Sequence, residues 1–230
     1  MKHLIWFRAD LRTIDNTALT IACQNPQAEV IGLYFISVEQ WQKHHTAACK
    51  VDFELATLKH LSSRLQQLNI PLIVINSLNF NTQIIDLVNF CQKEKIDRVF
   101  FNTQYEINEL HRDQQITQKL TANNINVHRF DDQCIVTPSR VLTNDGRFYT
   151  VFTPFKKTWL QQIQQIGLQI VPAPTVRQTA SKLQASIVPT QLKEFSSHIS
   201  ADTAKKFWPA VEEAALKRLD IFCQHHIRGY

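Results

Sequence analysis

Short runs of β-branched and aromatic residues alternate with helical patterns through the first 130 residues, and this alternation constrains the fold more than any other feature of the chain. The strand candidates are residues 3–7, 29–36, 72–76, 98–102 and 126–130. Strands that alternate with helices predict parallel β-α-β units wound into one sheet. Continuous apolar runs such as 30–36 agree, because both faces of such a sheet are covered by helices.

Helical patterns lie between these strands, near residues 16–23, 51–68, 82–94 and 108–122. In the second of them, leucines recur three or four positions apart, which predicts one apolar stripe facing the sheet: Leu55, Leu58, Leu61 and Leu65. The predicted fold class is therefore α/β and Rossmann-like. It is a doubly wound five-stranded parallel sheet, followed by a long linker and a terminal helix.

The pattern changes after the fifth strand. An aromatic-rich stretch at 148–155, broken by Pro154, precedes a helix that we expect to end near Ile166. Residues 168–204 lack periodicity and are rich in Pro, Ser, Thr and Gln, so we interpret them as a linker lying along a surface. An amphipathic helix is expected at 210–223, with Pro209 near its first turn. Its apolar face needs a partner.

This pattern predicts four parts: a domain core at 1–135, an aromatic-rich extension and helix of the same domain at 136–167, an interdomain linker at 168–204, and a first helix leading into a further domain at 205–230.

Composition excludes several classes of protein. The net charge of +5 is compatible with an anionic partner but is far from that of a nucleic-acid-binding tail. Five dispersed cysteines without a C-x-x-C pair indicate reduced thiols rather than a disulfide framework. The apolar runs are too short to span a bilayer and no signal peptide fits, so we expect a soluble, cytoplasmic protein with no membrane partner. No catalytic or metal-binding motif is present, so we expect neither kind of site.

The most highly charged block reads W-F-R-A-D-L-R-T-I-D-N at positions 6–16, at the carboxyl edge of the first strand, where open α/β sheets bind ligands. One interpretation is a contact with an anion or with DNA. The other is a salt-bridged scaffold in which Asp15 caps the first helix and Arg8 and Asp10 fix the end of the strand. Alternating charges cancel the local field, which favours the scaffold.

Two further segments reach the same sheet edge. His44 follows the second strand, and with His45 and Cys49 it offers too few ligands for zinc, although a ligand over the edge could meet its imidazole. Asn108 and Glu109 follow the fourth strand, where Asn108 is a candidate N-cap and the Glu109 carboxylate gains from the helix dipole. The alternative is that this pair recognises a heterocycle, because a carboxylate accepts paired N–H donors and a carboxamide both donates and accepts.

Four blocks, in order, resemble the DNA photolyases of the photolyase/cryptochrome family. They are Trp-Phe-Arg-x-Asp-Leu-Arg-x-x-Asp-Asn at 6–16, Asn-x-x-Tyr-Glu-x-Asn-Glu-x-x-Arg-Asp at 102–113, Val-Phe-Thr-Pro-Phe at 151–155, and Trp-Pro with the amphipathic helix at 208–223. The resemblance covers nearly the whole chain. It is closest to the bacterial cyclobutane pyrimidine dimer photolyases that carry a folate antenna.

The resemblance implies that the core at 1–135 is an α/β domain carrying a light-harvesting chromophore. The positions matching His44, Asn108 and Glu109 would contact methenyltetrahydrofolate, with Glu109 holding the donor edge of the pterin. Energy would then pass to reduced FAD, which donates an electron to a pyrimidine dimer in UV-damaged DNA. The position matching Tyr230 would make the first FAD contact.

The chain stops where the flavin-binding helices of the family would begin. We therefore expect the helical flavin domain to be the missing intramolecular partner of residues 205–230, and we expect the 230 residues alone to be inactive in repair. On this interpretation the chain itself carries no catalytic residue. Two alternatives stay open: a cryptochrome-type blue-light receptor that shares these blocks, and a nucleotide-binding α/β domain unrelated to light.

Overall fold

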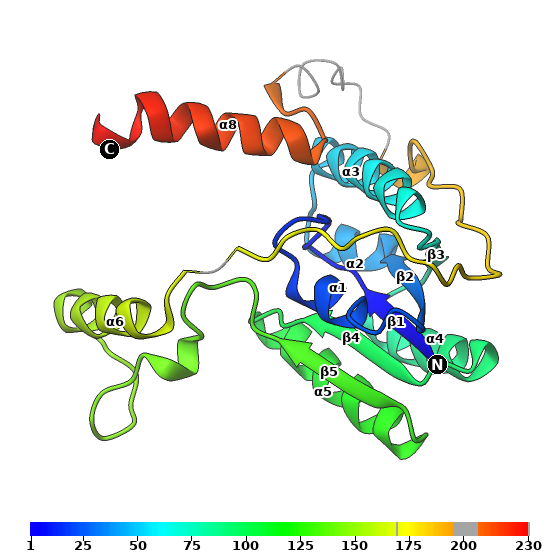
Figure 1. The fold of residues 1–230 in the computed structure, drawn as a ribbon, viewed down its shortest axis with the longest axis horizontal. Helices are drawn as coiled ribbons and strands as arrows, with labels where there is room; N and C mark the ends of the chain where they lie inside the picture. Colours follow the sequence, from blue (N-terminus) through cyan, green and yellow to red (C-terminus); the bar gives the residue numbers. More distant parts are fainter. Residues whose placement is uncertain (169, 196–206, 230) are drawn as a thin grey trace.

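The structure is a computed structural model that describes residues 1–168, 170–195 and 207–229. A five-stranded sheet, in which every neighbouring pair of strands is parallel, has the order β3-β2-β1-β4-β5 (Figure 1). The predicted doubly wound, Rossmann-like α/β fold is therefore confirmed. Only the first strand differs from its predicted bounds, by one residue at each end; the strands are β1 (Lys2–Trp6), β2 (Glu29–Ile36), β3 (Leu72–Asn76), β4 (Arg98–Asn102) and β5 (Asn126–Phe130).

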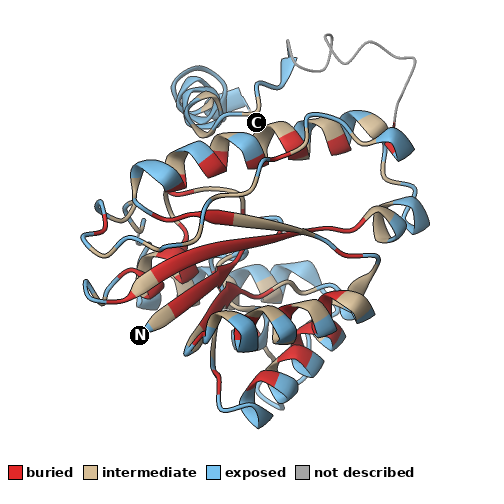
Figure 2. Ribbon diagram, turned by 90° about the vertical axis from the view of Figure 1, so that its right-hand side faces the viewer, coloured by how far each residue is buried: buried red, intermediate tan, exposed pale blue. Residues whose placement is uncertain are grey.

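Helices cover both faces of the sheet, so the strands are buried between two layers (Figure 2). Leu4 and Trp6 of β1 pack with the α4 and α5 side, whereas Ile5 and the following Phe7 pack with the α1 and α3 side. The helices and 3-10 turns are α1 (Thr17–Ala22), α2 (Val38–Lys43), α3 (Ala48–Gln67), α4 (Phe80–Glu94), α5 (Ile107–Ala122), η1 (Pro138–Arg140), α6 (Phe152–Ile166), η2 (Lys193–Phe195), α8 (Glu212–His225) and η3 (Ile227–Gly229).

The apolar stripe of α3 faces the sheet as predicted, because all four of its leucines are at most 2% exposed. Beneath it, a Cβ at Gly32 of β2 would lie 3.0 Å from Leu72 Cδ1 and 3.4 Å from Leu65 Cδ1. The missing side chain of Gly32 therefore leaves the space that these two leucines fill. Close packing of α3 on the sheet depends on that small residue.

Two helix caps differ from the predictions. Asn16 is the N-cap of α1, and its Oδ1 accepts the Leu19 N–H at 3.1 Å. The prediction that Asp15 caps this helix is wrong, because Asp15 has a left-handed backbone (φ 54°) rather than the extended geometry of a cap. In α5 the N-cap is Glu106, so the prediction of Asn108 as a cap is also wrong; Asn108 is the second residue of the helix.

The short helix α2 was not expected from the sequence, and the structure shows why: it has six residues, none of them fully buried, and it contacts the core through the partly buried Val38 and Trp41. The α6 helix begins at Phe152 and includes Pro154 in its first turn, where the missing N–H of a proline costs no hydrogen bond. The predicted interruption at Pro154 is therefore wrong. The terminal helix α8 begins at Glu212, two residues later than expected.

Residues 170–195 run along the surface of the α/β domain on the side of α1 and α3 (Figure 1), and we call them the connector. The guanidinium of Arg177 is buried and donates to the backbone carbonyls of Cys23, Asn25 and Ala28. Its backbone N–H donates to Leu68 O at 3.0 Å. Arg177 thus fastens the connector to the segment that follows α1 and to the carboxyl-terminal end of α3, through neutral backbone acceptors.

The α6 and α8 helices extend from the domain on the same side in Figure 1. Among their described residues none is buried, and large apolar side chains such as Phe152 and Leu219 are exposed. The apolar faces predicted for these helices are therefore present but uncovered.

Replacing Arg177 with methionine is expected to lower the free energy of unfolding by about 2–3 kcal/mol, because three carbonyls lose a buried donor. Equilibrium urea unfolding measures the change. The matched variant Lys182→Met alters an exposed side chain of the same connector and should change stability by no more than about 0.5 kcal/mol. Equal effects of the two variants would contradict the anchoring role of Arg177.

Candidate functional site

Two loops meet at the carboxyl edge of the sheet, where the winding direction reverses between β1 and β4. Arg8 follows β1, and its Nη1 lies 3.2 Å from both carboxylate oxygens of Asp113 in α5. Its Nη2 donates to the backbone carbonyl of Asn102, at the end of β4. The Asn102 side chain donates to Asp10 Oδ2 at 2.7 Å and to Asn16 Oδ1 at 3.0 Å. These bonds tie the ends of β1 and β4 together.

The buried arginines of this network lie against aromatic rings. Cζ of Arg8 is 4.5 Å from the ring centre of Trp6 and 4.6 Å from that of Phe101. Cζ of Arg112 is 4.7 Å from Trp6 and 4.6 Å from Phe80. Contacts of a cation with a ring face stabilise a guanidinium that has lost its water. Trp6 therefore contacts two cations.

A single carboxylate compensates both guanidinium groups. Asp113 is fully buried, and its Oδ1 accepts from Arg112 Nη2 at 2.9 Å as well as from Arg8. Burial lowers the pKa of Arg8 to about 10, and the charge of Asp113 opposes that shift. Arg8 consequently stays protonated at neutral pH.

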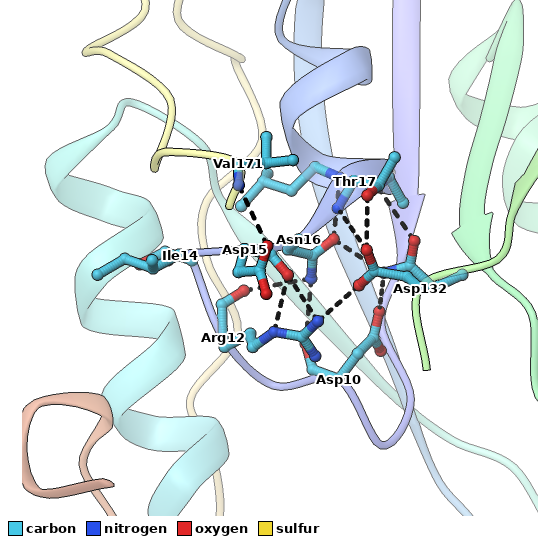
Figure 3. Close-up of polar contacts among 12 residues, drawn as sticks. Asp10, Arg12, Ile14, Asp15, Asn16, Thr17, Asp132 and Val171 are labelled. Carbon is cyan, nitrogen blue, oxygen red and sulfur yellow. Dashed lines mark hydrogen bonds and ion pairs between the residues drawn. The ribbon is translucent and has the colours of Figure 1, made fainter. Parts of the chain in front are cut away.

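The remaining charges of the 6–16 block are also occupied by partners within the protein (Figure 3). Arg12 Nη2 lies 2.6 Å from both Asp15 O and Asp132 Oδ2. Asp15 exchanges two hydrogen bonds with the backbone of Val171, at 2.7 and 3.1 Å. The predicted salt-bridged scaffold is confirmed, but Asp113 and Asp132, which lie outside the block, are the ion-pair partners of its arginines.

A cavity of about 580 Å³ opens above this network. Its lining comes from the ends of β1 and β2 and from helices α2 to α5, and combines aromatic rings with polar groups. A second cavity of about 510 Å³ lies between α2, α4 and α5. The two cavities adjoin, because four residues line both of them: Gln40, His44, Phe80 and Arg112.

The structure brings the three sequence-predicted ligand residues to these two cavities. His44, at the end of α2, lines both; Glu109 lines the first and Asn108 the second. His44 Nε2 is 2.8 Å from Gln40 Nε2. Among the described residues, the carboxylate of Glu109 has no hydrogen-bond or ion-pair partner within the protein, so it is available to a ligand. Tyr230, the fourth predicted site residue, lies outside the described residues.

Sequence reasoning missed an inner polar group on the wall of the larger cavity. The Tyr34 hydroxyl donates to Glu54 Oε1, and Gln83 Nε2 donates to Ser37 Oγ at 2.7 Å. Burial raises the pKa of Glu54 above its ordinary value, while the hydrogen bond from Tyr34 acts in the opposite direction. The signal was weak, because Tyr34 sits inside an apolar strand run and Gln83 inside an amphipathic helix.

Within the part of the chain that the structure describes, two buried polar atoms of cavity-lining residues have no hydrogen-bond partner: Gln83 Oε1, an acceptor, and Arg8 Nε, a donor. Buried polar atoms are nearly always hydrogen-bonded, so these two atoms are polar groups that the protein alone leaves unsatisfied. Aromatic walls with a few polar groups suit a flat heterocycle. No cluster able to hold a metal ion occurs among the residues that the structure describes, and none of the described helices is long and apolar enough to cross a membrane.

Comparison with known proteins gives consistent matches. Residues 3–180 match the family model described as DNA photolyase. The deoxyribodipyrimidine photo-lyase of Salmonella typhimurium is 35% identical over 221 residues, which cover 96% of this chain and 45% of that protein. The chain therefore spans less than half the length of this curated relative.

Solved structures share the fold. A bacterial class III photolyase from Agrobacterium tumefaciens aligns with a TM-score of 0.72 at 24% identity, over 96% of this chain and 44% of the other. A cryptochrome from Synechocystis sp. PCC6803 aligns with a TM-score of 0.66 at 17% identity, over 84% and 40%. At these identities the likeness concerns the fold alone.

Replacing Asp113 with asparagine is expected to lower the free energy of unfolding by about 3–5 kcal/mol, because two buried guanidinium groups lose their counter-ion. Urea unfolding gives the value. The control Asp145→Asn removes an exposed carboxylate that pairs with Arg147 and should leave stability unchanged. An Asp113→Asn protein as stable as the wild type would show that the network is not an anchor.

The Glu54→Gln variant is expected to change how stability depends on pH. Because the pKa of Glu54 is raised in the folded protein, the wild type loses stability as pH rises from 4.5 through that raised value, and the variant lacks this loss. Urea unfolding across this pH range, taken as a difference between the two proteins, isolates the effect. The Tyr34→Phe variant lacks the hydrogen bond that lowers the Glu54 pKa. Its stability should therefore continue to fall up to a higher pH than that of the wild type. A difference that is flat with pH would refute the assignment.

Proposed function

Because the chain belongs to the DNA photolyase family, we propose that its α/β domain is the light-harvesting domain of a deoxyribodipyrimidine photo-lyase. In this role the domain binds an antenna chromophore that absorbs light and passes the energy to reduced FAD. The flavin then donates an electron to a cyclobutane pyrimidine dimer in UV-damaged DNA. The observation that carries the proposal is the pair of adjoining cavities at the ligand-binding edge of a photolyase-family sheet.

We propose methenyltetrahydrofolate as the antenna, held by His44, Asn108 and Glu109. The Glu109 carboxylate is half-buried and has no partner among the described residues, so it can accept two N–H bonds from the donor edge of a pterin. The neighbouring carboxamide of Asn108 can both donate and accept, and it faces the second cavity. His44 borders both cavities and so lies where the two parts of an elongated ligand would meet.

The flavin and the DNA are proposed to belong to the protein's helical part. We propose that residues 1–135 are the antenna domain core, 136–167 its extension, 168–204 an interdomain linker, and 205–230 the start of the flavin domain. The uncovered apolar faces of α6 and α8 support this organisation, since such faces need a packing partner. Tyr230 is the proposed first FAD contact.

A blue-light receptor of the cryptochrome type is the second candidate. The Synechocystis cryptochrome shares the fold, but the relative at 35% identity is named a deoxyribodipyrimidine photo-lyase, which favours the photo-lyase. A nucleotide-binding domain unrelated to light would show no affinity for the folate, so the experiment below separates it from both.

The purified chain is expected to bind 5,10-methenyltetrahydrofolate, and Glu109→Gln is expected to weaken that binding about 10- to 100-fold, the value of a hydrogen bond to a charged group. A titration followed by the absorption and fluorescence of the pterin measures both affinities.

The matched variant Glu94→Gln, at the carboxyl end of α4 and outside the lining of both cavities, should bind like the wild type. Absence of binding by the wild type, or equal affinity in the Glu109 variant, would reject the proposed site.

A further inference from the structure

The beginning of α8 is fastened to the loop after β1 by one carboxylate. Glu212 Oε1 accepts the Ile14 N–H at 2.7 Å and the Thr13 N–H at 3.2 Å. Its Oε2 accepts the Thr13 N–H at 3.1 Å and the Thr13 hydroxyl at 2.9 Å. Residues 199 positions apart in the chain are thereby joined, and we call this contact the Glu212 clamp.

The receptor half of the clamp is held in place by other bonds. Arg12 donates to Asp15 O, and Asp15 is paired with the backbone of Val171, so both ends of the segment around Thr13 are fixed (Figure 3). Thr13 itself is 1% exposed. Consecutive backbone N–H groups that point to one side form a concavity for anions, and a carboxylate is the strongest acceptor for them. The loop therefore presents a preformed site for Glu212.

Other described polar contacts of α8 with the domain are weaker in kind. Glu213, the next residue, pairs with His60 at 3.1 Å and with Arg64 at 3.5 Å, but its side chain is 57% exposed. Exposed ion pairs hold a geometry poorly, since water competes for both charges. No described residue of α8 is buried, and of these two polar contacts the Glu212 clamp is the better shielded from water.

The clamp lies beside the candidate chromophore site. Leu11 and Arg12, which directly precede Thr13, line the larger cavity. Consequently, one short loop contacts the cavity with its first residues and holds α8 with its next two.

We propose that Glu212 is a positioning residue that fixes the direction in which α8 leaves the α/β domain. The consequence for activity rests on the proposed function: if the cavity holds the antenna and α8 leads to the flavin domain, the clamp sets the distance and orientation between the two chromophores. Energy transfer depends on both quantities. Glu212 would then affect the efficiency of light use without contacting either chromophore.

Native thiols allow the clamp to be tested in this chain. Cys49 in α3 and Cys223 in α8 are exposed, Cys23 and Cys91 are buried, and Cys134→Ser removes the remaining exposed thiol. Spin labels on Cys49 and Cys223 report the distance between the two helices by pulsed electron resonance. We expect a narrow distribution for the wild type, and a broad, shifted one for Glu212→Gln, whose amide N–H₂ opposes the loop N–H groups.

Hydrogen exchange at the Thr13 and Ile14 amides should also accelerate about tenfold or more in Glu212→Gln, because a bond to a charged acceptor is lost. The thermal unfolding midpoint of the α/β domain should stay unchanged. If Glu212 served only to stabilise that domain, the variant would lower the midpoint. Thr13→Val removes only the hydroxyl bond and should give an intermediate distribution, so it decides the question if Glu212→Gln does not fold.

The control Glu213→Gln removes the exposed ion pairs on the same helix turn and should keep the narrow distribution. A Glu212→Gln protein with the wild-type distribution would overturn the proposal, as would equal broadening in the two glutamine variants. Neither measurement involves folate or light, so failure of the clamp and failure of the proposed function are distinguishable.

Discussion

The buried ion pair between Arg8 and Asp113 is the interaction on which the arrangement of the site depends. It joins the loop after β1 to α5, across 105 positions of sequence, at the point where the sheet reverses its winding. A guanidinium at this depth is tolerable because a carboxylate, a backbone carbonyl and two aromatic rings replace its water. Since Arg112 shares the same carboxylate, the wall of the cavity and the anchor of the fold are one network.

This network explains why two distant blocks of sequence identify the family. Residues 6–16 and 102–113 bond directly to each other, through Arg8 to Asp113 and through Asn102 to Asp10 and Asn16. The charged side chains of these two blocks therefore hold the sheet edge together. The groups left for a ligand are the ones around them, including Glu109, which has no hydrogen-bond or ion-pair partner among the described residues.

The chain after the core is held by two contacts of complementary chemistry. Arg177, a cation, donates hydrogen bonds to backbone carbonyls that follow α1. Glu212, an anion, accepts hydrogen bonds from backbone N–H groups of the loop after β1. Each charge meets the polar backbone groups that a turn or helix end leaves without partners. Segments without apolar periodicity are in this way attached at defined places on the domain.

The sequence by itself determined the strands, the long amphipathic helices, the parallel sheet, the family and the edge at which His44, Asn108 and Glu109 lie. Apolar periodicity is a local property, so it can be read along the chain. It failed where local signals were weak or ambiguous: α2 is six residues long and has no fully buried residue, and Asn16 rather than Asp15 caps α1 because Asp15 has a left-handed backbone. Only the tertiary structure decided that Arg8 pairs with Asp113, that the polar wall of Tyr34, Glu54 and Gln83 borders a cavity, and that Arg177 and Glu212 act as anchors. These contacts join residues that are distant in sequence, and their partners are set by the packing of the sheet and helices rather than by any pattern along the chain.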